Sequence, residues 1–325
     1  MSWPERYNPD EVSALQHAFN IKLDRGEPAF WSEYQNEPMD ESSEGGTELT
    51  ADDILAKISG SERGEVPVTC SLLTMFVDIQ QRVLYWIVVA WENDFSGYVI
   101  DYGTEPEQKV PYFTMSEITR TLARAAPGAG LEGSIRAGLE RLSKRTVGRE
   151  WRQEGGGKME IDLCLVDANW STSTDLVYQF SRQTEYRGVI MPSHGRYVGA
   201  SSKAFLEYAK KKGDRVGLNW RIAAPGSKRA IRYALYDSNW WKSFVHARLA
   251  TALGDPGCMS LFGRQKRKNH HQLLADHLTS EYRILTEGRG RTVDEWKQYA
   301  VHRDNHWLDG VVGCAVGASI RGATR

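Results

Sequence analysis

Three aspartates stand out because each follows or lies within a segment that is otherwise apolar. Asp78 comes after the run Leu72–Val77, Asp167 after Ile161–Val166, and Asp309 within a glycine-rich stretch near the C-terminus. A buried carboxylate is costly unless it is paired or bound to a metal ion. Three neighbouring carboxylates would also repel one another at neutral pH, and divalent cations remove that repulsion.

The chemistry available to such a group is metal-assisted hydrolysis. Oxygen-only ligands suit Mg²⁺ or Mn²⁺ rather than zinc, and two such ions about 3.5–4 Å apart can activate a water and stabilise the leaving oxygen of a phosphodiester. We therefore predict that Asp78, Asp167 and Asp309 are catalytic metal ligands. The alternative for Asp78 is a structural one, because aspartate commonly opens a hairpin turn.

The elements that would position these acids follow from apolar patterning. Leu72–Val77 and Val83–Trp91 read as neighbouring strands, and the first is predicted to be central because it is almost continuously apolar. With a third strand at Gly97–Tyr102 they form an antiparallel meander. Later segments read as a strand–helix–strand unit that adds parallel strands: Ile161–Val166, Asp175–Gln183 and Gly188–Met191. The predicted fold class is α/β, a mixed β-sheet flanked by helices.

The tail Asp304–Ser319 is predicted to be a helix that begins at Asp304 as its N-cap. Gly310, Gly313 and Gly317 are poor helix formers. They are explained if this helix lies flat against a sheet, where absent side chains allow close approach. His306, Asp309 and Gly313 have the spacing of one helix face, so the carboxylate would face the packed side.

Length and composition describe an ordinary globular protein of 325 residues, 41% hydrophobic and 26% charged, with a formal net charge of −1. Contact with nucleic acid would therefore come from local basic clusters. The strongest is the run 264–271, and its Arg264, Lys266, Arg267 and Lys268 are predicted DNA-binding residues.

Cysteine usage and terminal sequence predict a cytoplasmic protein. The four cysteines form no CxxC pair, which is typical of reduced thiols. There is no apolar run of membrane-spanning length and no signal-peptide pattern at the N-terminus. Zinc is disfavoured because no compact Cys/His spacing occurs.

Composition shifts divide the chain into three predicted parts. Residues 1–45 contain a helix at Asn8–Asp24, residues 46–65 a linker with a short capped helix, and residues 66–325 the main domain. An acidic connector at Asp40–Thr47 crosses the first of these boundaries. Gly155–Lys158 lacks the GxxxxGK[ST] spacing of a phosphate-binding loop, and the chain has no such motif.

Several short stretches resemble the nuclease domain of tailed-phage terminase large subunits, in particular the lambda-like branch, which has a ribonuclease H-like fold. The run Val77-Asp-Ile-Gln-Gln-Arg82 is similar to the first acidic strand of that family, and Asp167 with Thr172–Phe180 to its second acidic strand and following helix. Asp304–Asp309 looks like the C-terminal acidic helix, and Phe30–Pro38 like the segment that joins motor to nuclease.

The resemblance implies a metal-dependent endonuclease that cuts double-stranded, concatemeric viral DNA during genome packaging, with two Mg²⁺ or Mn²⁺ ions. By this resemblance, the metal ligands would be Asp78, Asp167 and Asp309. His306 and Asp304 would be auxiliary residues of the same site. The implied partners are a portal protein, a small terminase subunit and a packaging ATPase, in the host cytoplasm.

The chain departs from complete terminase large subunits, because they begin with a packaging ATPase that this sequence lacks. It is then a nuclease fragment, a subunit whose motor is encoded separately, or a domesticated relative. Two other functions stay open: a resolvase- or transposase-like nuclease of the same fold, and a non-catalytic module that docks DNA or a portal.

Overall fold

The computed structural model describes residues 11–14, 16, 17, 20, 48–169, 174–225, 231–264, 269–299 and 304–323. The chain divides into two compact units, Met1–Glu48 and Leu49–Arg325. The helix predicted at Asn8–Asp24 lies mostly outside the described residues, and Phe30–Pro38 and the connector Asp40–Thr47 lie wholly outside them. The three-part division of the chain stays a prediction.

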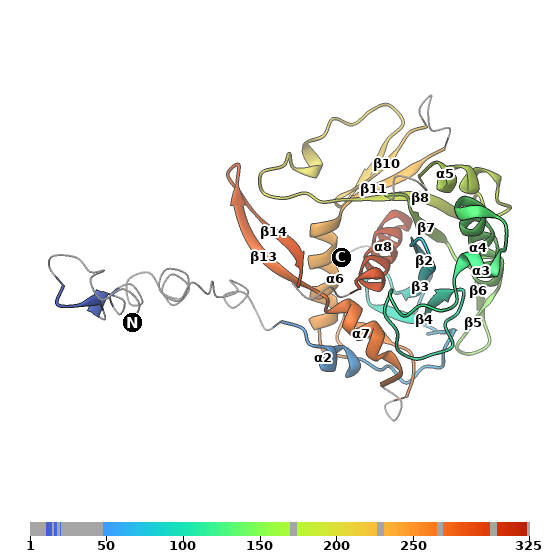
Figure 1. Ribbon diagram of the computed structural model, residues 1–325, viewed down its shortest axis with the longest axis horizontal. Coiled ribbons are helices and arrows are strands. Elements are labelled where there is room, and N and C mark those ends of the chain that lie inside the picture. Colours follow the sequence, from blue (N-terminus) through green and yellow to red (C-terminus); the bar gives the residue numbers. More distant parts are fainter. Residues whose placement is uncertain are drawn as a thin grey trace. The chain divides into compact units, whose positions relative to one another are not determined.

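The second unit is built on a nine-stranded mixed sheet (Figure 1). Its central meander joins β2, β3 and β4 antiparallel, and β7, β8 and β11 then add in parallel beside β2. This arrangement confirms the predicted α/β class and is that of a ribonuclease H-like fold. In spatial order the strands are β12 (Met259–Leu261), β4 (Gly97–Glu105), β3 (Leu84–Trp91), β2 (Leu72–Ile79), β7 (Leu163–Asp167), β8 (Ile190–Arg196), β11 (Tyr233–Asp237), β10 (Trp220–Ala223) and β9 (Arg215–Gly217).

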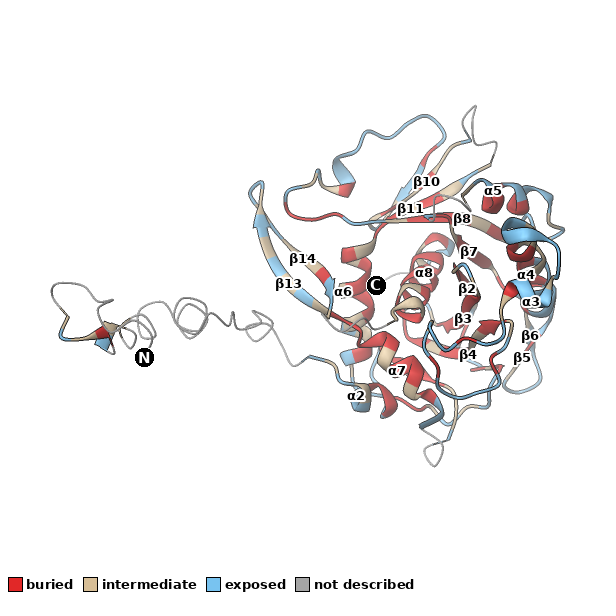
Figure 2. Cartoon of the chain, viewed as in Figure 1, coloured by how far each residue is buried: buried red, intermediate tan, exposed pale blue. Residues whose placement is uncertain are grey.

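Helices cover both faces of the sheet and enclose two apolar cores (Figures 1 and 2). One core is shared by α8 (His306–Arg321), α6 (Ser238–Ala250), α7 (Gln272–Leu278) and α2 (Ala51–Leu55). The other is shared by α3 (Leu122–Ala125), α4 (Gly130–Thr146) and α5 (Thr174–Gln183). No helix of the described part is both long and apolar enough to cross a membrane.

Strand periodicity places the first two aspartates on the face that α8 covers. Successive side chains of a strand alternate between the two faces of a sheet. Phe76 and Leu165 belong to the α8 core, whereas Val77 and its register partner Val166 belong to the opposite core. The next residues, Asp78 and Asp167, therefore return to the α8 face at the carboxyl ends of two adjacent parallel strands.

Helix α8 lies against β2, β3 and β7, as its glycines predicted. A Cβ atom added at Gly313 would lie 1.8 Å from Cδ2 of Phe76, and one added at Gly310 would lie 2.7 Å from Cγ2 of Ile87. Figure 2 shows α8 as almost entirely buried. The small residues thus let the helix axis approach the sheet closely enough to hold its first turn beside Asp78.

Some predicted elements differ from the observed ones. The sequence of residues Met115–Ala126 also predicts a helix, but only α3 forms there. The guanidinium of Arg82 binds the carbonyls of Met115 and Ile118 and holds the start of that segment as a turn. Asp304 is not the N-cap of α8. Asn305 holds that position, and Asp304 instead accepts a hydrogen bond from the backbone N–H of Met115 at 3.0 Å.

Smaller elements complete the unit. The hairpin β13 (Glu281–Gly288) and β14 (Arg291–Gln298) was not predicted; it turns at Arg289 and Gly290, both with positive φ, as a two-residue hairpin turn requires. The segment around Gly155–Lys158 is the turn between two short strands. Those strands and the remaining elements are β5 (Trp151–Gln153), β6 (Lys158–Met159), β1 (Glu65–Val66) and the 3₁₀ helix η3 (Phe205–Glu207).

We expect Gly313→Ala to lower the free energy of unfolding by about 2 kcal/mol, because the new methyl group would collide with the Phe76 ring. Gly317→Ala is the matched control on the same helix. Its Cβ would lie 3.3 Å from Cγ2 of Thr74, a contact that the helix-propensity gain of alanine offsets. Urea denaturation of both variants measures the difference, and an equal loss in the two would contradict flat packing of α8.

Candidate active site

The three predicted acids meet at one end of the sheet. Asp78 and Asp167 are neighbours at the carboxyl ends of β2 and β7, and Asp309 lies in the first turn of α8, which packs over both strands. They lie close enough that the charges of Asp78 and Asp309 both raise the pKa of Asp167. The sequence pattern thus located three side chains that the fold brings together.

Asp167 has no charged partner among the residues that the structure describes. Its Oδ1 accepts a hydrogen bond from the backbone N–H of Asn169 at 3.3 Å. Loss of hydration, followed by the charges of Asp78 and Asp309, raises the pKa of Asp167 to about 8. A cation beside Asp167 would therefore stabilise its carboxylate more than it would stabilise Asp78 or Asp309, which already have a basic partner.

Asp78 is held by side chains from its own turn and from α8. Oδ2 lies 2.7 Å from Nδ1 of His306, and Nε2 of Gln80 donates to Oδ2 at 3.0 Å and to Oδ1 at 3.2 Å. Burial lowers the pKa of His306, but the hydrogen bond and charge of Asp78 outweigh it and the pKa is raised overall. The imidazole also stacks on Tyr85, with ring centroids 4.3 Å apart, so Asp78 and His306 fix one another.

Asp309 belongs to a second network that includes a lysine and another acid. Nζ of Lys242, on α6, lies 3.2 Å from Oδ1 of Asp309 and 2.6 Å and 2.7 Å from the two carboxylate oxygens of Glu281. Asn305 donates from Nδ2 to both acids. Burial lowers the pKa of Lys242, but the two carboxylates outweigh this effect and raise it, so the ammonium stays charged between them.

Sequence reasoning missed Lys242, Glu281 and Tyr236. Lys242 carried a signal, because it is a lone cation in the aromatic run Asn239–Val245, and a charge in such a run requires a partner. Tyr236 lies within electrostatic reach of the three aspartates: burial, and then the charges of Asp167, Asp309 and Asp78, raise the pKa of its hydroxyl well above the usual value. Glu281 gave no signal, since it opens a hairpin that was not predicted.

Comparison with known proteins identifies the family. A family model described as the terminase large subunit gpA endonuclease domain matches residues 28–325. The chain belongs to this family. The resemblance seen in the sequence is therefore confirmed. As a terminase nuclease domain, the chain has a nuclease role in phage DNA packaging, with DNA as substrate and the packaging machinery as partner. No curated protein matches the chain.

The donor set of the terminase domain suits a hard divalent cation, since it consists of carboxylates. As placed, however, the described residues contain no group of three or more His, Cys, Asp or Glu side chains arranged to hold a metal ion. The reason is visible in the contacts: Asp78 is engaged by His306, and Asp309 by Lys242. A metal ion held by all three acids would require Asp78 and Asp309 to give up these contacts.

The predicted basic cluster is only partly described. Arg264 is exposed and forms an ion pair with Glu62, with Nη2 and Oε1 2.5 Å apart. Lys266, Arg267 and Lys268 lie outside the described residues. Both side chains of this pair are exposed, and an ion pair of this kind restrains Arg264 only weakly. The assignment of this cluster to DNA stays a prediction.

Replacing Lys242 tests the Lys242–Glu281–Asp309 network. Lys242→Met should lower the free energy of unfolding by about 3 kcal/mol, because it leaves the carboxylate of Glu281, 3% exposed, without a counter-ion. Adding Glu281→Gln to that variant should recover about 1 kcal/mol or more. Urea denaturation in EDTA measures both, and strictly additive losses would show that the two side chains are not coupled.

Proposed function

We propose that this terminase domain is a metal-dependent endonuclease that hydrolyses phosphodiester bonds of double-stranded, concatemeric viral DNA. The observation that carries the proposal is the convergence of Asp78, Asp167 and Asp309 at adjacent strand ends, with Asp167 lacking a counter-ion among the described residues. Membership of a terminase endonuclease family supports it independently.

The proposed ligands are these three aspartates, and the proposed ions are two Mg²⁺ or Mn²⁺. When bound, such ions supply an activated water and stabilise the leaving oxygen of the cleaved bond. Asp167 is the best candidate for a metal ligand. A bound cation would offset the loss of hydration and the like charges that now raise the pKa of its carboxyl group. Asp78 and Asp309 would complete the ligand set as their present hydrogen bonds rearrange.

Neighbouring side chains would position these acids. His306 holds Oδ2 of Asp78 and is itself fixed by stacking on Tyr85. Lys242 holds Asp309 and balances the negative charge of the site before any metal enters. The hydroxyl of Tyr236 keeps its proton, since its pKa is raised well above the usual value, and it can donate a hydrogen bond to a water or a phosphate oxygen.

The specific partners are proposed from the family resemblance. A packaging ATPase would move the DNA, a portal protein would receive it, and a small terminase subunit would direct the cut, all in the host cytoplasm. Asp304, which binds the backbone of Met115 and lies 3.9 Å from Nε2 of His306, would act by orienting that imidazole.

Substitution of the acids tests the nuclease proposal. Asp78→Asn, Asp167→Asn and Asp309→Asn should each lower the rate of linear duplex cleavage in Mn²⁺ by about a hundredfold or more. Asp175→Asn, an exposed position in the first turn of α5, is the control and should cleave normally. Cleavage by Asp167→Asn at the parent rate would contradict the proposal.

A second measurement separates metal binding from cleavage. Saturating Mn²⁺ should raise the melting temperature of the parent protein by about 4 °C, because it binds only the folded state. Asp167→Asn should lose most of this increase. An unchanged Mn²⁺ effect in Asp167→Asn would place the ion elsewhere, whatever the cleavage assay shows.

The basic cluster is tested through the salt dependence of DNA binding. Replacing Lys266, Arg267 and Lys268 with alanine should weaken duplex binding and reduce the log–log salt slope by about one for each phosphate that these side chains neutralise. The matched control replaces the three consecutive, exposed lysines Lys210–Lys212, which removes the same charge. Equal effects of the two triple variants would indicate a net-charge effect and would contradict a specific DNA contact at 266–268.

A further inference from the structure

A pocket of about 400 Å³ lies at the end of the sheet opposite the three predicted catalytic acids. Leu163 and Ile190, which begin the parallel strands β7 and β8, line it, whereas Asp167 ends β7. Ile320, near the end of α8, lines it as well, so that helix runs from the acids to this pocket. We call it the arginine pocket, because five of its lining residues are arginines: Arg182, Arg187, Arg215, Arg232 and Arg321.

No carboxylate balances these five charges in the part of the chain that the structure describes. The lining contains no Asp or Glu, and none of the five guanidinium groups forms an ion pair there. Arg232 and Arg321 donate only to the backbone carbonyls of Gly213 and Asp162. Three of the arginines have side chains that make neither a hydrogen bond nor an ion pair with any described residue, namely Arg182, Arg187 and Arg215.

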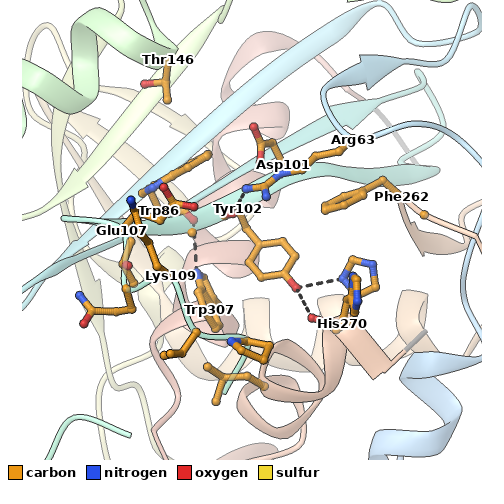
Figure 3. A pocket seen from close by; sticks show the side chains of 18 of the residues that line it. Arg63, Trp86, Asp101, Tyr102, Glu107, Lys109, Thr146, Phe262, His270 and Trp307 are labelled. Carbon is orange, nitrogen blue, oxygen red and sulfur yellow. Dashed lines mark hydrogen bonds and ion pairs between the residues drawn. The ribbon is translucent and has the colours of Figure 1, made fainter. Parts of the chain in front are cut away.

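A larger cavity of about 1160 Å³ beside β4 shows a different balance of charge (Figure 3). Its lining contains acids as well as bases, and two of its arginines are paired with lining carboxylates. These pairs are Arg63 with Asp101, drawn side by side in Figure 3, and Arg264 with Glu62. The arginine pocket is smaller and yet gathers formal charge of one sign only.

Helix ends explain only two of the five arginines. Arg182 and Arg321 lie in the last turns of α5 and α8, where a cation interacts favourably with the helix dipole. Arg215 begins β9, and Arg232 immediately precedes β11, so no helix end accounts for these two. Arg187 lies in the segment between α5 and β8. Like charges gathered at one pocket repel one another, and a bound anion removes that repulsion.

The remainder of the lining is apolar except for one glycine and one buried hydroxyl group. Ile190, Ile222 and Ile320 are between 1% and 6% exposed. Ser181, in the last turn of α5, is 2% exposed, and its Oγ has no hydrogen-bond partner in the described structure. A buried polar group without a partner is costly. A ligand that carries both an apolar part and acceptor oxygens would therefore satisfy the pocket.

The concentration of charge favours phosphate over the carboxylates of a peptide. A guanidinium group binds two phosphate oxygens at once, and a chain of phosphates places several negative charges within a few ångströms. Side chains on the same face of an extended peptide are about 7 Å apart. Few of them could enter a pocket of about 400 Å³ together, so a peptide would leave most of the arginines without a partner.

The apolar lining narrows the ligand further. A bare phosphate ion would leave Ile190, Ile222 and Ile320 uncovered, whereas a base or sugar would cover them. Cavities of this volume are typical of small-molecule sites. A DNA duplex is too wide to enter, but a single unpaired nucleotide is not. The pocket therefore has the chemistry and the size for one nucleotide.

We propose that the arginine pocket binds a nucleotide, with its phosphates on the arginines and its base against Ile190, Ile222 and Ile320. Two sources share this chemistry, a free nucleoside triphosphate and an unpaired nucleotide at the end of a DNA strand. The proposal does not depend on the nuclease proposal, because it uses none of the catalytic residues and no metal ion.

Isothermal titration calorimetry of the full 325-residue chain tests the proposal with two ligands, ATP and a 5′-phosphorylated single-stranded 12-mer. EDTA in the buffer prevents metal binding and cleavage. Arg187→Gln and Arg215→Gln should each weaken the Kd about tenfold, and stability should be unchanged because neither side chain has a described partner. Lys144→Gln, an exposed position on α4 outside the pocket, removes the same charge and should bind as the parent does.

The two ligands distinguish the two sources. ATP binding that depends on the arginines assigns the pocket to free nucleotides, and binding of the 12-mer alone assigns it to a DNA end. Tripolyphosphate should bind at least about tenfold more weakly than the ligand that binds, because it leaves the apolar lining uncovered.

The proposal is overturned if neither ligand binds, if both arginine variants bind as the parent does, or if tripolyphosphate binds as tightly as the nucleotide. Decaglutamate and a blunt 20-base-pair duplex are the competing polyanions. Equally tight binding of either one, with the same dependence on Arg187 and Arg215, would assign the pocket to an acidic protein segment or to a duplex backbone and would also overturn it.

Discussion

Repulsion among Asp78, Asp167 and Asp309 is the constraint on which the arrangement of this end of the sheet depends. Asp78 and Asp167 lie at the carboxyl ends of two parallel strands, and Asp309 lies beside them on α8. Their charges would separate the elements if nothing balanced them. Lys242 and His306 supply that balance at Asp309 and Asp78, whereas Asp167 remains unbalanced and its pKa is raised to about 8.

The balance comes from elements far apart in the chain. Lys242 lies on α6, Glu281 on the first strand of the β13–β14 hairpin, and His306 at the start of α8. Close packing of α8 through Gly313 against Phe76 holds the helix in reach of β2. A site that the protein's own cations neutralise can fold without metal. In the proposed function, a divalent ion would replace the contact with Lys242 or His306.

The mixed sheet has two different surroundings at its parallel and antiparallel parts. The carboxyl ends of its parallel strands carry the acidic site, while β4 of the antiparallel meander borders a cavity lined by Arg145 and Arg149 on one side and by Tyr102 and Trp307 on the other. Trp307 borders that cavity one residue after His306, and its Nε1 donates to the carbonyl of Trp86. The two surfaces therefore share the first turn of α8, although their chemistry differs.

Apolar runs, glycine spacing and isolated carboxylates are local patterns that burial imposes, and they predict the strands that carry Asp78 and Asp167, the helical tail and the three aspartates. Period-two alternation even places Asp78 and Asp167 on one face once their strands are parallel neighbours. Other features of the site follow only from the folded chain. Lys242, Glu281 and Tyr236 acquire their roles from contacts between distant elements, and no local pattern encodes those contacts. Likewise, Asp304 proved to be a partner of the Met115 backbone rather than a helix cap, because a long-range hydrogen bond took the place of the local one.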